Sequence, residues 1–122
     1  MSISIANTSR LKSKKKIGLL FEKGKRLSVG PLHLRYLEVD RNEDSLFGFS
    51  VPKKNHALAV HRNRIKRLMR ESLRIQNDTS LEKGMLFMFI YLGKTVPEYE
   101  ELCELMNNIL KKRSNETVKL PA

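Results

Sequence analysis

The apolar residues of the chain follow two different spacings, which predict its helices and strands. Apolar residues three and four positions apart indicate helices, and the helical segments are 17–23, Ala59–Arg74 and 95–113. Alternating or continuous apolar runs between Gly, Pro or charged residues indicate strands, predicted at 25–29, 32–39, 46–51 and 85–92. The order α-β-β-β-α-β-α predicts an α+β fold, with a small central sheet of about four strands and helices packed on it.

Local signals predict where these elements end. Gly24 is a suitable stop for the first helix, and the polar run 40–44 predicts a hairpin loop between two strands. Asn55 is the predicted N-cap of the helix at Ala59–Arg74. Thr95 and Glu98 are placed to form a capping box at the start of the last helix.

The organisation along the chain predicts one domain, at residues 17–113 of 122. Residues 1–16 are basic and acid-free and are predicted to form a flexible N-terminal arm, with an organellar transit peptide as the alternative. Residues 114–122 are predicted to be a frayed tail. The run at 85–92, MLFMFIYL, lacks alternation, which predicts a central strand covered on both faces.

The distribution of charge indicates which kind of partner the protein binds. The formal net charge is +11, the sum of +12 on residues 1–75 and −1 on residues 76–122. An excess confined to one part of the chain is typical of a binding surface, because a general solubility device would be spread evenly. The distribution predicts a nucleic-acid partner.

The predicted helix at Ala59–Arg74 has two faces. An apolar stripe is formed by Leu58, Ile65, Leu68, Met69 and Ser72, with His61 and Leu73 close by. The opposite, polar face carries Asn63, Lys66, Arg67, Arg70 and Arg74, while Arg62 and Arg64 flank the stripe. Like charges four residues apart destabilise a helix, so a polyanion along this face would relieve the repulsion.

Several classes of chemistry lack their residues. A single cysteine, Cys103, excludes an internal disulfide, and three scattered histidines give no metal-ligand spacing. The sequence has no Gly-rich phosphate loop and no acid pair beside a His. We therefore expect no catalytic residue and no metal site in the protein, a reducing compartment, no membrane span and no obligate protein partner.

The segment 62–71, RNRIKRLMRE, resembles the signature of the protein subunit of bacterial ribonuclease P. The preceding GFSVPKK at 48–54 is similar to the family's strand ending in a Lys-Lys pair, and LFEKG at 20–24 resembles its first short helix. The resemblance covers roughly residues 10–113. Two departures stand out: segment 55–58 is about one residue longer than in the family and lacks its Gly, and Ile17 replaces an aromatic residue.

The resemblance implies a subunit of an endoribonuclease. The enzyme that contains this subunit removes the 5′ leader from precursor tRNA by phosphodiester hydrolysis, in the bacterial cytoplasm. A large RNA subunit carries catalysis with Mg2+ that is bound mainly by that RNA, while the protein binds the RNA and holds the leader in a cleft between the sheet and the central helix. The family also implies a left-handed βαβ crossover through that helix, against the right-handed default.

The resemblance also assigns roles to residues of this chain. The residues expected to bind RNA are Arg62, Asn63, Arg64, Lys66, Arg67 and Arg70. The candidates for the leader cleft are Phe21, Tyr36, Ser50, Lys53 and Lys54. Aromatic rings suit this task because they stack on unpaired bases with little sequence preference.

Three other functions fit part of the pattern. A structural RNA-binding protein of the ribosomal type has the same electrostatics, and only the RNR segment separates the two. A DNA-binding protein could place the basic helix in a major groove, but no dimerisation element accompanies it. A self-sufficient nuclease is disfavoured by the missing acid and metal set.

Overall fold

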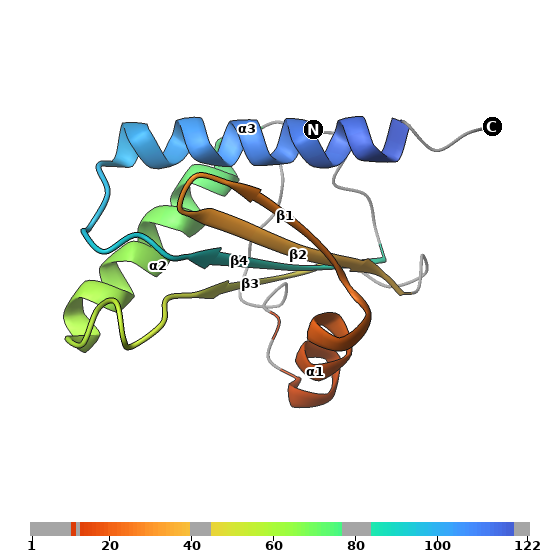
Figure 1. The fold of residues 1–122 in the computed structure, drawn as a ribbon, viewed down its shortest axis with the longest axis horizontal. Helices are drawn as coiled ribbons and strands as arrows, with labels where there is room; N and C mark the ends of the chain where they lie inside the picture. The colour runs from red at the N-terminus through yellow and green to blue at the C-terminus, as the bar shows by residue number, and fades with distance from the viewer. Residues whose placement is uncertain (1–10, 12, 40–44, 77–83, 119–122) are drawn as a thin grey trace.

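The computed structural model describes residues 11, 13–39, 45–76 and 84–118 and confirms the predicted α+β class (Figure 1). The elements follow the predicted order and are α1 (Lys14–Lys23), β1 (Lys25–Val29), β2 (Leu32–Glu38), β3 (Leu46–Ser50), α2 (Ala59–Arg74), β4 (Met85–Tyr91) and α3 (Tyr99–Val118). Helices α2 and α3 lie on one side of the sheet and α1 on the other (Figure 1).

The four strands lie in the order β1-β2-β4-β3. Strand β4 pairs antiparallel with β2 and parallel with β3. Strand β3, helix α2 and strand β4 therefore form the expected crossover between parallel strands. The left-handed sense of this crossover stays a prediction. The hairpin predicted across 40–44 is wrong, because β4 separates β2 from β3; residues 40–44 themselves lie outside the described residues. A strand apolar on both faces gains most from the central position, and β4 takes it.

The two faces of the sheet carry separate apolar clusters. The larger lies under α2 and α3 and includes Phe87 and Phe89 of β4. The smaller lies under α1 and joins Leu20 to Leu86 and Met88. Burial on both faces of β4 confirms the interpretation of its continuous apolar run.

The first helix begins earlier than predicted. Ser13 is its N-cap and accepts a hydrogen bond from the backbone N–H of Lys16, so the predicted flexible arm 1–16 is wrong at its end; residues 1–10 and 12 lie outside the described residues. Leu11 is buried in the cluster under α1, and its N–H donates to the carbonyl of Phe47, 2.9 Å away. Gly24 ends the helix as predicted.

The last helix begins and ends later than predicted. Its first residue is Tyr99, and Thr95 is exposed in the preceding bend. The predicted capping box, with Thr95 as the first cap, is therefore wrong, because the helix begins four residues after Thr95. Glu98 directly precedes the helix, and its backbone carbonyl accepts a hydrogen bond from the N–H of Leu102. The helix runs to Val118, past the predicted boundary at 113. No helix among those described is long and apolar enough to cross a bilayer.

The turn before α2 is built from the segment that departs from the family pattern. The side-chain amide of Asn55 donates to the carbonyl of Leu92, 3.1 Å away, and Nε2 of the buried His56 lies 2.8 Å from the carbonyl of Gly93. The predicted cap at Asn55 is wrong, because Leu58 occupies the N-cap position without a side-chain hydrogen bond. Asn55 and His56 instead fasten the turn to the residues after β4.

Tyr91 makes stability depend on pH at the alkaline end. Burial, and secondarily the charge of Glu101, raises the pKa of Tyr91 above its ordinary 10.0. The folded state therefore holds the phenol proton more tightly than the unfolded chain, so this stabilisation is complete below pH 10.0 and is lost as pH rises through the folded-state pKa. We expect the difference in unfolding free energy between wild type and Tyr91→Phe to shift against wild type above pH 10, measured by urea unfolding across that range; a pH-independent difference would contradict this.

Candidate nucleic-acid interface

Helix α2 buries its apolar stripe and leaves its cations outside the core. The buried residues are Ile65, Met69, Ser72 and Leu73, and Leu68 is partly buried against the same core. Leu58, predicted to belong to the stripe, is 61% exposed because it precedes the first helical turn. His61, expected close to the stripe, is exposed too. The helix otherwise has the two predicted faces, and its cationic face is turned toward the surface, where a partner can meet it.

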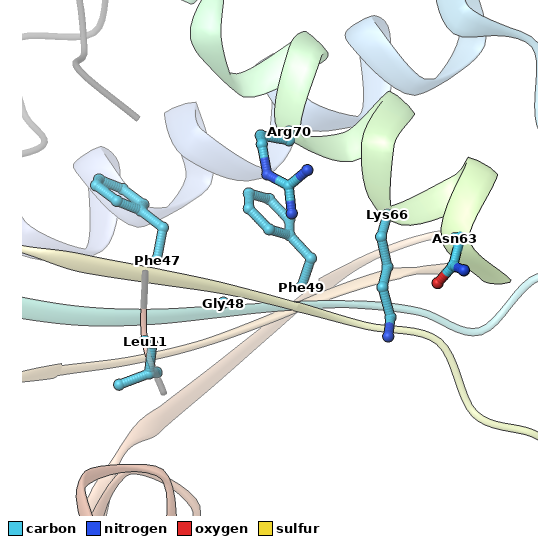
Figure 2. Close-up of a pocket in the computed structure, with 7 residues that line it drawn as sticks. All are labelled: Leu11, Phe47, Gly48, Phe49, Asn63, Lys66 and Arg70. Carbon is cyan, nitrogen blue, oxygen red and sulfur yellow. The ribbon is translucent and has the colours of Figure 1, made fainter. Parts of the chain in front are cut away.

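A groove of about 480 Å³ lies between α2 and β3 (Figure 2). Its lining residues are Asn63, Lys66 and Arg70 from α2, Phe47, Gly48 and Phe49 from β3, and Leu11. The guanidinium of Arg70 lies 5.5 Å from the centre of the Phe49 ring. The groove thus places cationic and amide donors beside an aromatic ring, which are the groups that bind the backbone and the bases of a nucleic acid.

A second hollow, of about 540 Å³, lies on the outer side of α2. It is lined by Val60, Asn63, Arg64, Arg67, Leu68 and Glu71. Nε of Arg67 lies 3.4 Å from a carboxylate oxygen of Glu71, one turn away. Such an exposed pair is weak, so a phosphate can replace Glu71 as the partner of Arg67 at little cost.

The six residues expected to bind RNA therefore divide into two groups. Five line one or both hollows of α2. The sixth, Arg62, turns back: its Nη1 donates to the carbonyls of His56 and Ala57, at 2.9 and 2.8 Å. Arg62 thus holds the turn before the helix, and its contact with RNA stays a prediction.

The cleft candidates are more scattered. Phe21 projects from α1 on the opposite side of the sheet from α2, and it is 40% exposed. Its ring lies 4.7 Å from the guanidinium of Arg35, whose Nη1 also donates to the Phe21 carbonyl. This cation fixes the ring in place, and part of the ring stays exposed at the surface.

Tyr36 does not line a cleft. It is 7% exposed in the core under α3, where the guanidinium of Arg113 lies 5.8 Å from its ring. Alternation along β2 puts Tyr36 on the same face as Leu34, so the prediction of a cleft position is wrong. Ser50 is partly exposed at the end of β3, and Lys53 and Lys54 are exposed in the following turn.

Several residues near these surfaces were not among the predicted site residues. The groove is also lined by Leu11, Phe47, Gly48 and Phe49, and Arg35 holds Phe21. Alternation along 46–51 was a usable signal for Phe49, because it separates that residue from Ser50 by face. Nothing in the local sequence marks Leu11, whose place depends on pairing with β3.

Among the residues that the structure describes, no group of three or more His, Cys, Asp or Glu side chains lies together in a way that could hold a metal ion. Within the same residues, the features that stand out are the basic face of α2, its groove and the exposed aromatic ring on α1. Together they define a nucleic-acid-binding protein.

Comparisons with known proteins specify the family. The family model described as Ribonuclease P matches residues 5–114. The chain is 31% identical over 105 residues to the ribonuclease P protein component of Clostridium botulinum (strain Langeland), covering 85% of this chain and 93% of that protein. It is 33% identical over 105 residues to that of Clostridium kluyveri, covering 84% and 92%. The chain belongs to the ribonuclease P protein family.

Solved structures agree in fold. The RNase P protein from Thermotoga maritima superposes with a TM-score of 0.71 at 26% identity, covering 84% of this chain and 96% of that one. The RNase P protein of Staphylococcus aureus superposes with a TM-score of 0.74 at 21% identity, covering 86% and 94%. Family membership makes this chain a protein component of an endoribonuclease holoenzyme in tRNA processing, partnered with the ribonuclease P RNA.

Proposed function

We propose that the protein binds the catalytic RNA through the basic face of α2 and holds the 5′ leader of precursor tRNA, so that the holoenzyme removes the leader by hydrolysis and leaves a 5′ phosphate. The observation that carries this is the groove between α2 and β3, where Lys66 and Arg70 stand beside Phe49. Cations bind phosphates and an aromatic ring stacks on bases, whatever the sequence.

In this proposal the RNA subunit carries catalysis. The described residues supply donors and aromatic rings for binding and positioning, and no group of three or more of their His, Cys, Asp and Glu side chains could hold a metal ion. We assign Mg2+ mainly to the RNA for the same reason. We place the holoenzyme in the bacterial cytoplasm, which suits a chain with the single cysteine Cys103.

We place the leader on the face that carries α1, and not in the cleft between the sheet and the central helix that the resemblance implies, because the exposed Phe21 lies on the side of the sheet opposite α2 (Figure 1). Phe21 is the exposed ring there, held by Arg35. Ser50 lies on the same face, because it is the register partner of Ile90, which packs against the cluster under α1. Lys53 and Lys54 follow in the exposed turn. A single strand stacked on Phe21 thus has polar and cationic groups along its path.

The test is cleavage of precursor tRNA at low Mg2+ with a bacterial ribonuclease P RNA. The reactions compare RNA alone, RNA with this protein, and RNA with Arg67→Ala/Arg70→Ala. Stimulation of correct cleavage by wild type, and much weaker stimulation by the variant, is the expected result. A protein that binds RNA but never stimulates cleavage, with the cognate RNA included, would instead be a structural RNA-binding protein.

A further inference from the structure

We propose that the outer edge of β1 carries a phosphate-binding site formed by Arg26, His33 and Lys112, which takes a backbone phosphate of the leader after it has crossed the sheet. This inference rests on the proposed function, since it extends the path of the leader. A hollow of about 460 Å³ lies at this edge, lined by Arg26, Leu27, Ser28, His33 and Lys112. It is separate from the groove and the hollow of α2, whose lining residues it does not share.

Lys112 is brought to this edge by a specific contact. Helix α3 packs on β1 (Figure 1), and Nζ of Lys112 donates to the backbone carbonyl of Ser28, 3.1 Å away. An ammonium group has three donors, so this bond positions the charge and leaves two donors for another acceptor. The Lys112 cation therefore stands at the strand edge in a defined place.

Arg26 stands in an arrangement that favours an anion. It is the direct register partner of Arg35 on the neighbouring antiparallel strand, and like charges directly opposite each other destabilise a sheet. Within the described residues, neither Arg26 nor Lys112 forms an ion pair with an acid. A phosphate between Arg26 and Lys112 would offset this repulsion.

A continuous row of side chains joins this site to the leader candidates. Ser28 pairs with His33, His33 with Ile90, and Ile90 with Ser50. The row crosses all four strands on the face of α1, a span of about 14 Å at roughly 4.8 Å between strands. All four residues of the row are at least partly exposed. A single strand that passes Ser50 can therefore reach Arg26 and Lys112 along one open row.

The leader is the favoured source of the phosphate because the row shares its face with Phe21. The cross-strand pair Arg26 and Arg35 adjoins the row, and Arg35 holds the Phe21 ring. The RNA-binding cations of α2 lie on the other side of the sheet. A phosphate of the catalytic RNA has the same chemistry, so the experiment must separate the two sources.

The experiment measures binding of precursor tRNA to the reconstituted holoenzyme, with leaders lengthened one nucleotide at a time. With wild-type protein, affinity should rise with leader length to a plateau. With R26Q/K112Q the final rise in affinity should be absent. Affinity for long leaders should fall about tenfold, and affinity for short leaders should not change. For long leaders, the slope of log K against log salt should correspond to about one fewer neutralised phosphate. Lys94→Gln/Lys111→Gln removes the same number of charges at exposed positions that do not line the hollow and is the matched control.

Each other outcome decides against one of the two proposals. If R26Q/K112Q follows the wild-type length profile while remaining folded by thermal melting, the site at β1 does not exist. If it loses affinity equally at every leader length, and also binds the catalytic RNA less tightly without substrate, the phosphate belongs to that RNA and the leader assignment is overturned. If wild-type protein gives no gain over RNA alone at any length, the proposed function itself fails.

Discussion

Replacing Lys66 and Arg70 together with alanine is expected to weaken binding to the catalytic RNA by about a hundredfold or more. Both side chains line the groove beside β3, and each can donate a charge-assisted hydrogen bond to a phosphate, worth roughly 1.5–3 kcal/mol. Removing both bonds costs about 3 kcal/mol or more, and every 1.4 kcal/mol is about tenfold in affinity. The measurement is equilibrium binding by filter retention at several salt concentrations.

Salt dependence separates the removal of phosphate-binding side chains from a general reduction of charge. The slope of log K against log salt should become shallower by about 1.4–1.8, since each neutralised phosphate contributes about 0.7–0.9. Lys94→Ala/Lys111→Ala removes the same charge from exposed positions outside the groove and should leave the slope close to wild type. Equal reductions in affinity for the two double variants would mean that overall charge, rather than the groove, governs binding.

The helices and strands were predictable because burial has a local period. A helix that faces a core on one side repeats every 3.6 residues, and a strand repeats every two. Helix α2 accordingly has its predicted bounds, Ala59–Arg74. Its cations were predictable too, because a helix that buries one face must expose the other. This is why five of the six residues expected to bind RNA line the hollows of α2.

Strand order and individual side-chain positions depend on distant parts of the chain. The hairpin expected at 40–44 fails because β4 enters between β2 and β3. Tyr36 was assigned by residue type, whereas the face it occupies places it in the core under Arg113. Leu11 is held at the groove by a backbone hydrogen bond to Phe47, which lies 36 positions along the chain. No local sequence pattern encodes such a contact.

Phe87→Ala is expected to cost about 3–5 kcal/mol of unfolding free energy, the usual range for a large core residue truncated to alanine. The side chain is 0% exposed on the central strand. Its ring centre lies 5.3 Å from that of Phe47 and 6.4 Å from that of Phe89, so its removal leaves a cavity between the sheet and the helices α2 and α3 that cannot easily close. The total free energy of unfolding of a typical domain is only about 5–15 kcal/mol. Urea unfolding followed by circular dichroism measures the loss.

Phe21→Ala is the matched control, because it makes the same chemical change at a residue that is 40% exposed. It removes the contact with Arg35, worth about 0.5–1 kcal/mol at an exposed site, so unfolding should change by no more than about that amount. The effects on function should be the opposite of those on stability. A folded Phe21→Ala protein should support cleavage poorly when binding depends on the leader. The folded fraction of Phe87→Ala should bind RNA normally. If Phe21→Ala destabilised the fold as much as Phe87→Ala, the ring on α1 would be a core residue, and the leader path would lose its aromatic platform.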